Sequence, residues 1–441
     1  MKIKQAVLSV LLAAAMVISS ACGTSEQNNN ITTSGNDTEA ATVAVQETTN
    51  AETEGTKTDT SAAEESTDTA ESASETVSET TANAAETTKA EVSTTTAAAA
   101  TTSAAATTTA AAATTAATTT TAAATTTTAA PIDNPAASGS FQVTGTKLYD
   151  AKGNEFIMRG INHAHAWYQG QLTTALDGIA GTGANCVRVV LADGDKWGKT
   201  SASDVENIIG ECEKRRLVAI LEVHDTTFGS AGDEFSALDK AADYWVEMKD
   251  IVNSHTDTVI VNIANEWHNG GWRKSKDWAD GYLKVIPKLR EAGIKNTLMV
   301  DCDGNGQYPQ SLFDYADEIF DCDTLKNTMF SIHMYEYAGK DERTIKNNID
   351  KVLDKNLCLV IGEFGFKHTN GDIDEQYIMK YCTEKDVGYI GWSWKGNGGG
   401  VEYLDIAESW DGSSLSSDWG EILVNDANGI RATSEICSVF D

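Results

Sequence analysis

Residues 258–267 read Thr-Val-Ile-Val-Asn-Ile-Ala-Asn-Glu-Trp, a run rich in β-branched apolar residues that passes into a polar and acidic pair. A run of this kind suits a strand buried on both faces. The stretch that follows, Trp278–Glu291, spaces its apolar residues as an amphipathic helix does, and Gly293 supplies a common helix end. The segment therefore predicts one strand–helix unit, with Asn265 and Glu266 placed where the strand ends.

The same alternation extends in both directions from this unit. The predicted strands are Phe156–Ile161, Asn185–Leu191, Val218–Val223, Thr258–Ile263, Thr297–Asp301, Thr328–His333, Cys358–Ile361 and Gly388–Trp392. The amphipathic stretches between them include Leu172–Ala180, Ala202–Lys214, Ala237–Asn253, Trp278–Glu291, Glu342–Lys355 and Glu375–Lys385. Eight strand–helix repeats in about 300 residues predict the α/β class and a (β/α)8 TIM barrel. A doubly wound open sheet is the alternative, but the Gly-rich phosphate loop that usually follows its first strand is missing.

The N-terminal third has a composition that excludes it from the barrel. No Leu, Met, Phe, Tyr or Trp occurs from Gly23 to Ala130, and residues 93–130 contain only Ser, Thr and Ala. A segment so poor in large apolar side chains cannot offset the entropy lost on ordering, so we expect a disordered linker. The predicted organisation is a signal peptide over 1–22, a Thr/Ala/Ser-rich linker over 23–138 and a single barrel domain over 139–441.

The first 22 residues are typical of an export signal. Lys2 and Lys4 precede an apolar run over 6–18 that is short for a membrane span, and small residues follow it. The segment ends Ile-Ser-Ser-Ala-Cys (18–22), which resembles the lipobox of bacterial lipoproteins, although an ordinary signal peptide with an incidental cysteine is the alternative. We therefore expect an extracellular protein, anchored to the cell surface through a lipid on Cys22.

The charge distribution limits the classes of partner. The whole chain has a net charge of -32, and residues 23–137 carry 16 acidic and two basic side chains. Residues 138–441 retain a net charge of -20. Such a surface repels nucleic acid and anionic lipid, so we expect no nucleic-acid partner and no membrane contact beyond the lipid anchor.

Polar, ionisable and aromatic side chains recur where the predicted strands end. They are His163 and Trp167 after the first strand, Arg188 on the second, Glu222 and His224 at the third, Asn265, Glu266 and Trp267 after the fourth, His333 and Tyr335 at the sixth, Glu363 after the seventh and Trp394 after the eighth. Each alone has an ordinary explanation as a helix cap, a hydrogen-bonded structural residue or a cover over the core. Because the carboxyl ends of all strands meet at one rim of a (β/α)8 barrel, their recurrence predicts an active site there.

Glu266 and Glu363 follow the fourth and seventh strands and therefore face each other across the barrel mouth. Such a pair suits glycoside hydrolysis, in which a protonated carboxyl donates to the leaving oxygen and an ionised one attacks the anomeric carbon. The expected separation is ~5–5.5 Å for retention of configuration and ~6.5–9.5 Å for inversion. Arg188 and Tyr335 can hydrogen-bond Glu363 and keep it ionised, and Trp394 offers a flat face for a sugar ring.

These residues and several longer strings resemble glycoside hydrolase family 5. The strings are Met-Arg-Gly-Ile-Asn-His-Ala-His-Ala-Trp-Tyr (158–168), Leu-Glu-Val-His-Asp (221–225), Asn-Ile-Ala-Asn-Glu-Trp (262–267), Phe-Ser-Ile-His-Met-Tyr-Glu-Tyr-Ala (330–338), Gly-Glu-Phe-Gly (362–365), Trp-Ser-Trp-Lys-Gly-Asn (392–397) and Asn-Gly-Ile-Arg-Ala-Thr (428–433). They are most similar to those of the bacterial endo-β-1,4-mannanases of subfamily 8. The resemblance runs from about Phe141 to Thr433 and leaves out the linker.

The resemblance implies a retaining double displacement on mannan, glucomannan or galactomannan, with Glu363 as nucleophile and Glu266 as acid/base. It implies that these carboxylates are oriented by Arg188, Asn265, His333 and Tyr335. It implies sugar contacts from His163, Trp167, His224, Trp267 and Trp394. No cofactor or metal is expected, and the protein is expected to be a monomer.

Two positions depart from the family pattern. His268 stands where a Tyr is expected, and Phe366 stands where a small residue is expected. Both are expected to reshape a subsite without altering the catalytic pair.

Other candidate constellations have structural explanations. Asp225, Asp301 and Asp303 at the rim follow no metal-binding spacing, so sugar contacts or cap roles are expected. Seven cysteines follow Cys22, an odd number, so at least one is not paired within the chain. Cys186 and Cys358 are expected to be buried. Cys302 and Cys322 are the first pair to test for a disulfide.

Two alternatives to a mannanase remain open at this stage. An endo-β-1,4-glucanase would use the same catalytic set. A non-catalytic polysaccharide-binding barrel is disfavoured, because a binding protein needs aromatic residues but not two glutamates with their Arg, Asn, His and Tyr neighbours.

Overall fold

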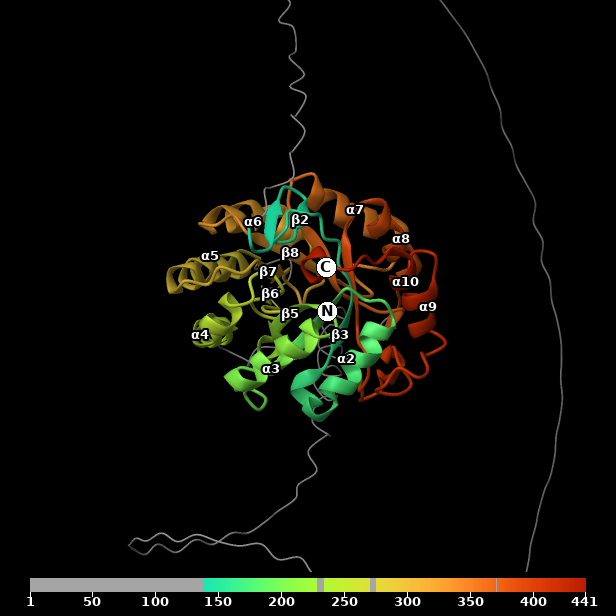
Figure 1. The fold of residues 1–441 in the computed structure, drawn as a ribbon. Coiled ribbons are helices and arrows are strands. Elements are labelled where there is room, and N and C mark those ends of the chain that lie inside the picture. Colours follow the sequence, from blue (N-terminus) through green and yellow to red (C-terminus); the bar gives the residue numbers. More distant parts are fainter. Residues whose placement is uncertain (1–137, 228–233, 270–274, 370) are drawn as a thin grey trace, which may run out of the picture. The chain divides into compact units, whose positions relative to one another are not determined.

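The computed structural model describes residues 138–441 apart from 228–233, 270–274 and 370. Eight strands form a closed barrel at the centre, and helices surround it in a ring (Figure 1). All neighbouring barrel strands pair in parallel, so the predicted (β/α)8 barrel is confirmed. The predicted signal peptide with Cys22 and the linker up to residue 137 lie outside the described residues.

The barrel strands follow chain order around the barrel, and the last pairs with the first. They are β3 (Arg159–His163), β4 (Cys186–Leu191), β5 (Val218–Val223), β6 (Val259–Asn262), β7 (Leu298–Asp301), β8 (Thr328–Met334), β9 (Leu359–Phe364) and β12 (Gly388–Gly391). Seven α-helices connect successive strands: α2 (Leu172–Gly181), α3 (Ala202–Glu213), α4 (Glu234–Asn253), α5 (Ser275–Ala292), α6 (Gln310–Cys322), α7 (Glu342–Leu353) and α8 (Glu375–Glu384). After β12 come two short helices, α9 (Gly420–Asn425) and α10 (Ile430–Thr433).

Residues that favour helix ends account for several boundaries. Ser201 caps α3 by accepting a hydrogen bond from the backbone N–H of Asp204, whose own side chain completes a capping box. Gly183, Gly293 and Asn356 all have positive φ after α2, α5 and α7, as expected for residues that end helices in the left-handed conformation.

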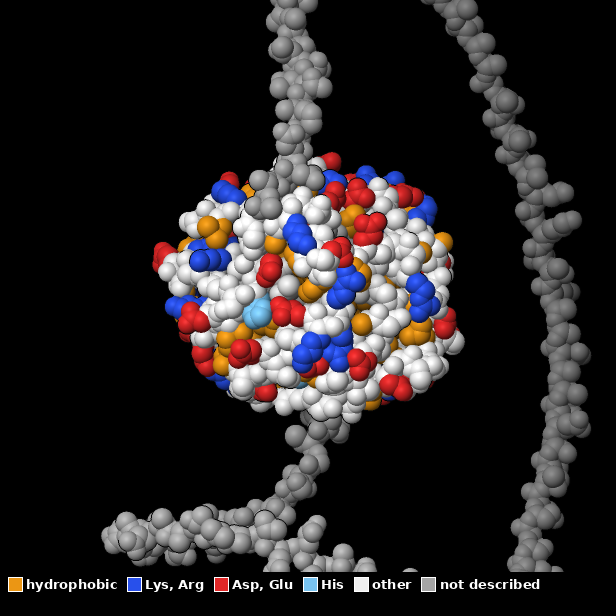
Figure 2. Space-filling view, viewed as in Figure 1, with side chains coloured by type: hydrophobic (Ala, Val, Ile, Leu, Met, Phe, Trp, Pro, Cys, Tyr) orange, Lys and Arg blue, Asp and Glu red, His pale blue; other side chains and the backbone are white. Residues whose placement is uncertain are grey.

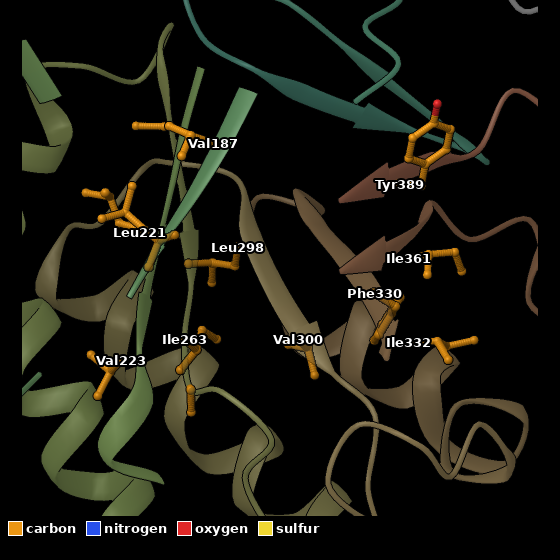
Figure 3. Packing of buried hydrophobic residues seen from close by; sticks show 14 of the residues in the cluster. Val187, Leu221, Val223, Ile263, Leu298, Val300, Phe330, Ile332, Ile361 and Tyr389 are labelled. Carbon is orange, nitrogen blue, oxygen red and sulfur yellow. The ribbon is translucent and has the colours of Figure 1, made fainter. Parts of the chain in front are cut away.

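Alternation along the strands separates the core from the site. On β4, Val187 and Val189 point outward into the main apolar cluster, which lies between the strands and the helices. Figure 3 shows members of this cluster from several barrel strands, among them Val187. Cys186 belongs to a second cluster inside the barrel, and Arg188 is the next inward position toward the carboxyl end. The same relation holds on three other strands, where a polar residue lies two positions beyond an apolar side chain of the inner cluster: Glu222, Asn262 and Asp301. On β8 the spacing is four residues, from Met329 to His333. The inner layer is thus apolar at the amino ends of the strands and polar at their carboxyl ends.

An N-terminal hairpin closes the apolar end of the barrel. Strands β1 (Gln142–Thr144) and β2 (Lys147–Tyr149) pair antiparallel, and Phe141 packs against Phe156 within the inner cluster. This differs from the prediction for Phe156, which was expected to begin the first strand. Its side chain belongs to the closing layer, and the ladder starts only at Arg159.

The outer surface mixes both signs of charge. The face in Figure 2 carries interspersed acidic and basic side chains, with hydrophobic ones in small separate patches. Within the described part of the chain, none of the helices is both long enough and apolar enough to span a membrane.

Candidate active site

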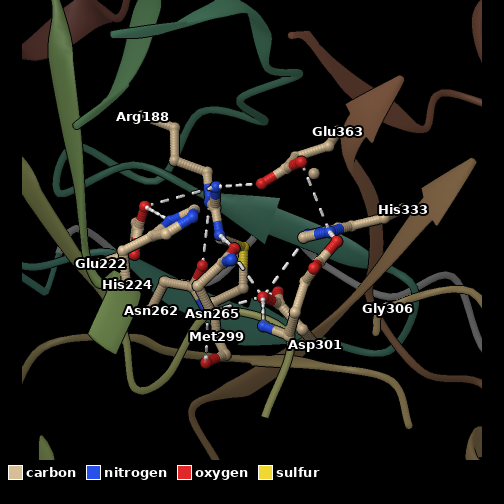
Figure 4. Close-up of polar contacts among 12 residues, drawn as sticks. Arg188, Glu222, His224, Asn262, Asn265, Met299, Asp301, Gly306, His333 and Glu363 are labelled. Atoms are coloured by element: carbon tan, nitrogen blue, oxygen red, sulfur yellow. Dashed lines mark hydrogen bonds and ion pairs between the residues drawn. The ribbon is translucent and has the colours of Figure 1, made fainter. Parts of the chain in front are cut away.

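The carboxyl ends of four barrel strands bring the predicted catalytic residues together. Arg188 comes from β4, Glu266 follows β6, His333 lies on β8 and Glu363 lies on β9 (Figure 4). One oxygen of Glu266, one oxygen of Glu363 and one ring nitrogen of His333 all lie within 4.8 Å of one another. This separation of the carboxylates agrees with the ~5–5.5 Å of retaining enzymes and not with the ~6.5–9.5 Å of inverting ones.

Glu363 is held at both carboxylate oxygens. Arg188 donates from Nη1 to Oε1 at 2.8 Å, and the Tyr335 hydroxyl donates to Oε2 at 2.9 Å. Burial and the neighbouring charge of Glu363 raise the pKa of Tyr335 well above its usual value, so the hydroxyl remains a donor. Both predicted contacts to Glu363 are therefore present, and they fix its orientation and balance its charge.

Glu266 has a different environment. Burial raises the pKa of its carboxyl, and the charge of Glu363 adds to this, while the hydrogen bond from His333 opposes it. Its backbone has a φ of 45°, in the left-handed region that non-glycine residues rarely adopt. A carboxyl that keeps its proton beside an ionised one is the arrangement that general acid catalysis requires.

His333 links the two carboxylates. Its Nδ1 lies 2.9 Å from Oε1 of Glu266 and 3.6 Å from Oε2 of Glu363, and its Nε2 lies 3.4 Å from Oδ2 of Asp301. Although burial opposes the charged ring, the negative charges of Glu363 and Asp301 raise the pKa of His333 to about 10. The imidazole is therefore a cation across the neutral pH range.

Arg188 organises the floor of the site. It is wholly buried and donates from Nε to Asn262 at 2.9 Å and from Nη2 to Asn265 at 2.6 Å. Asn265 in turn donates to the Thr227 hydroxyl at 2.6 Å, so its amide orientation is fixed from both ends. Asn265 thus lies where the sequence placed it, next to Glu266 and in contact with Arg188.

Aromatic rings line the mouth beside these charges. Trp167 has 38% of its surface exposed, and its ring lies 5.0 Å from that of His224, edge to face. His224 also stacks on Trp392 with ring centroids 5.8 Å apart, and Trp197 lies 5.2 Å from Trp167. The predictions for Trp167 and His224 agree with this placement, whereas Trp392 and Trp197 were not singled out from the sequence.

Three predicted sugar contacts are wrong, because Trp394, Trp267 and His163 are all wholly buried. Trp394 donates its indole N–H to the carbonyl of Trp410 at 2.9 Å, within the core. Trp267 packs its ring edge to face on Tyr282 of α5, at 5.4 Å. The signal that would have favoured Trp392 over Trp394 is position, since Trp392 directly follows the last residue of β12.

His163 is also buried away from the sugars. Burial lowers its pKa to about 3, so the ring is neutral, and its nearest aromatic neighbours include Trp410 at 6.2 Å. Its place at the end of β3 was read correctly from the sequence, but the side chain faces the core.

The acidic residues at the rim have structural partners. Asp225 accepts backbone hydrogen bonds from Asp193, Lys196 and Trp197, and so holds the loop after β4. Asp303 accepts from Ser275 at 2.9 Å and pairs with His268 at 2.8 Å. Both carboxylates thus have structural partners, but in the contacts described neither caps a helix by accepting from a backbone N–H of its first turn. The spacing of Glu266, His333 and Glu363 alone would admit a metal ion, but the cationic Arg188 and His333 at the same place disfavour one.

The cysteine predictions have mixed outcomes. Cys186 and Cys358 are buried, as expected. The disulfide considered between Cys302 and Cys322 is wrong, because both are free thiols that donate to the carbonyls of Gly306 and Ile319.

Comparison with known proteins agrees with this geometry. Residues 149–398 match the family described as cellulase (glycosyl hydrolase family 5). The chain is 53% identical to a mannan endo-1,4-beta-mannosidase of Salipaludibacillus agaradhaerens. The aligned 300 residues cover 68% of this chain and 96% of that protein. The chain is 42% identical to a mannan endo-1,4-beta-mannosidase of Streptomyces lividans, over 69% of this chain and 79% of that one. The fold matches a solved β-mannanase from Thermomonospora fusca with a TM-score of 0.65 and 41% identity, covering 68% of this chain and 99% of that chain.

Proposed function

Since the chain belongs to glycosyl hydrolase family 5, we propose that it hydrolyses β-1,4-mannosidic linkages inside mannan-type polysaccharides with retention of configuration. The observation that carries this proposal is the pair Glu266 and Glu363, whose oxygens approach within 4.8 Å and which have different hydrogen-bond partners. Supporting it, three relatives that are 53%, 42% and 39% identical to this chain over 300, 307 and 306 residues are named mannan endo-1,4-beta-mannosidases.

In the first step, Glu363 attacks the anomeric carbon of the sugar on its glycone side. A carboxylate oxygen forms the new bond to carbon as the glycosidic carbon–oxygen bond breaks. The bonding electrons leave with the departing oxygen, which takes the proton of Glu266. Arg188 and Tyr335 keep the attacking carboxylate in one orientation, which reduces the entropy lost on reaching the transition state.

In the second step, Glu266 acts as a base. It removes a proton from water as the water oxygen attacks the same carbon, and the ester bond to Glu363 breaks to release the carboxylate. Two inversions at one carbon give net retention. His333 hydrogen-bonds Glu266 at 2.9 Å, so it can stabilise the carboxylate form that this step requires.

An uncharged polysaccharide suits the surroundings of the pair. The net charge of -20 on residues 138–441 disfavours anionic polymers, and Trp167, Trp392 and His224 provide flat ring surfaces for sugar rings at the mouth. An endo-β-1,4-glucanase would use the same catalytic pair, so the test must separate the two substrates.

The test compares initial rates of reducing-end release on galactomannan, glucomannan and hydroxyethylcellulose, an uncharged soluble cellulose, with Glu363→Ala as the inactive control. We expect rapid release from the mannans and little from hydroxyethylcellulose. Faster release from hydroxyethylcellulose would favour the glucanase, and no release from any polymer would favour a binding protein.

We further propose that the protein is exported and held at the cell surface as a monomer through a lipid on Cys22. The basic start, the apolar run and the Ile-Ser-Ser-Ala-Cys ending support this proposal, as does a linker whose flexible length gives a reach of ~60 Å. Labelling with a fatty-acid analogue should mark the wild type and not Cys22→Ser, and the variant should appear in the medium. Equal labelling of both would contradict the proposal.

A further inference from the structure

The carboxylate of Asp301 lies directly beneath the catalytic pair and takes no part in the two steps above. Asp301 ends β7 and is wholly buried, so the sugar contact considered for it from the sequence is excluded. A buried carboxylate is costly unless cations or donors surround it. Its partners therefore indicate what it does.

One oxygen of Asp301 is shared by three groups of the site (Figure 4). Oδ2 accepts a hydrogen bond from the backbone N–H of Glu266 at 3.2 Å, and it lies 3.4 Å from both Nη2 of Arg188 and Nε2 of His333. The other oxygen, Oδ1, accepts from the side chain of Asn262 at 3.3 Å. Two of these partners involve Glu266. One is its own backbone N–H, and the other is His333, which hydrogen-bonds its carboxyl group.

The first connection runs through the backbone of the acid/base. Glu266 adopts a φ of 45°, which an L-residue keeps only when its surroundings hold it. The hydrogen bond to Asp301 ties the Glu266 N–H to the rigid end of a barrel strand. This contact fixes where the side chain of Glu266 starts.

The second connection runs through His333, which hydrogen-bonds the side chain of Glu266 with one nitrogen and faces Asp301 with the other. The charged or titratable groups that face this ring are Glu266, Glu363 and Asp301. Because Asp301 lies on the far side of the ring, it favours a cationic, doubly protonated imidazole whose Nδ1–H points at Glu266.

We propose that Asp301 is a positioning residue for the acid/base Glu266, acting on its backbone directly and on its carboxyl through His333. The inference rests on the proposed glycosidase function and adds a residue to that site. Its removal should weaken proton transfer more than it weakens the attack by Glu363, whose direct partners are Arg188 and Tyr335.

The test measures Asp301→Asn, which keeps the shape and removes the charge, on two substrates. Mannohexaose needs a proton on its leaving oxygen, whereas 2,4-dinitrophenyl β-mannobioside has a leaving group that departs without one. We expect kcat/KM to fall at least about tenfold on mannohexaose, which is a part of the ~10²–10⁴-fold that general acid catalysis contributes in total, and less than about threefold on the activated substrate.

Azide provides an independent measurement. Azide ion attacks the anomeric carbon of the glycosyl-enzyme without needing a base, forming a glycosyl azide and releasing Glu363. Added azide should therefore raise kcat of Asp301→Asn on the activated substrate and leave the wild type nearly unchanged.

The matched control is Asp323→Asn, the same change at another buried aspartate. Asp323 is buried and pairs with Arg290 at 2.8 Å, and it also accepts hydrogen bonds from Leu325, Asn327 and Thr328, which lie outside the site. We expect a lower unfolding temperature with an unchanged ratio of the two substrates and no response to azide.

Equal losses on both substrates without azide rescue, or no loss at all, would overturn the assignment of Asp301. If Asp301→Asn fails to fold, Asp301→Glu keeps the charge but displaces its oxygens, and the same substrate ratio decides. A wild type inactive on both substrates would instead refute the proposed function, so the two failures are distinguishable.

Discussion

Glu266 and Glu363 carry the same functional group in two different environments, and their neighbours differ accordingly. Glu363 receives hydrogen bonds from Arg188 and Tyr335, whereas burial raises the pKa of Glu266. The sequence predicts both glutamates correctly at the rim, because the carboxyl ends of all barrel strands meet there. It could not show burial, and for that reason Trp394, Trp267 and His163 were wrongly expected to meet sugars while Trp392 was overlooked.

Substitution of each glutamate should separate the two roles. Glu363→Ala should abolish turnover of every β-mannoside, because no nucleophile remains. Glu266→Ala should lower kcat on mannan by ~10²–10⁴-fold yet retain the first step on an activated aryl mannoside. Steady-state and burst kinetics on both substrates provide the measurement, with circular dichroism to show that each variant is folded. The assignment fails if either variant keeps most of its kcat on mannan.

His333 should make stability depend on pH. Its pKa is about 10 in the folded protein and about 6.5 when unfolded, so the folded state binds the extra proton between these values. This contribution is complete below about pH 6.5 and is lost as the pH rises toward 10. Urea unfolding at pH 7 and pH 9.5 should therefore show a larger loss of unfolding free energy for the wild type than for His333→Asn. Equal losses in the two proteins would contradict the proposed charge on His333.

At the scale of elements, the strands are what the sequence predicted best. Six of the eight predicted strands begin within one residue of the observed ones and end within one residue of them. Alternation of outward apolar and inward polar residues then explains the site, since Arg188, Asp301 and His333 are all inward positions near the carboxyl ends of their strands. The first strand was shifted because Phe156 and Met158 are apolar for another reason, namely closure of the barrel end.

The fit of the helices against the barrel also depends on single residues. An added Cβ at Gly281 of α5 would clash with the ring of Trp267, whereas one at Gly210 of α3 would meet open space. We expect Gly281→Ala to destabilise the protein by ~1–3 kcal/mol through overpacking. Gly210→Ala should instead stabilise it by up to about 1 kcal/mol through helix propensity. Denaturant unfolding of both variants checks this, and a stabilised Gly281→Ala would contradict the packing described here.

At the scale of the whole molecule, the composition of the chain divides it by task. All 10 Trp, 12 Tyr and 10 Phe lie from Phe141 onward, in the region that forms the barrel, and the aromatic-free segment before it matches the proposed tether. The division into signal peptide, linker and catalytic domain remains a prediction, because it depends on residues outside those that the structure describes. In the sequence, this division is visible from composition alone, because the aromatic residues are confined to one region.

The proposed assignment of domains has a direct consequence for activity. A variant that lacks residues 23–137 should keep the unfolding temperature and the kcat of the full chain on soluble galactomannan, because the apolar core lies in the barrel. Differential scanning calorimetry and rates measured side by side provide the comparison. A large loss of either quantity would show that the linker contributes to the folded domain.

The most direct test of the central claim is the configuration of the first product. Proton NMR can follow mannohexaose hydrolysis from the first minutes, before mutarotation mixes the anomers. Carboxylates whose oxygens approach within 4.8 Å predict that the β-anomer appears first and the α-anomer only later. Initial formation of the α-anomer, or no hydrolysis at all, would contradict the assignment of Glu363 and Glu266 as the nucleophile and acid/base of a retaining mannanase.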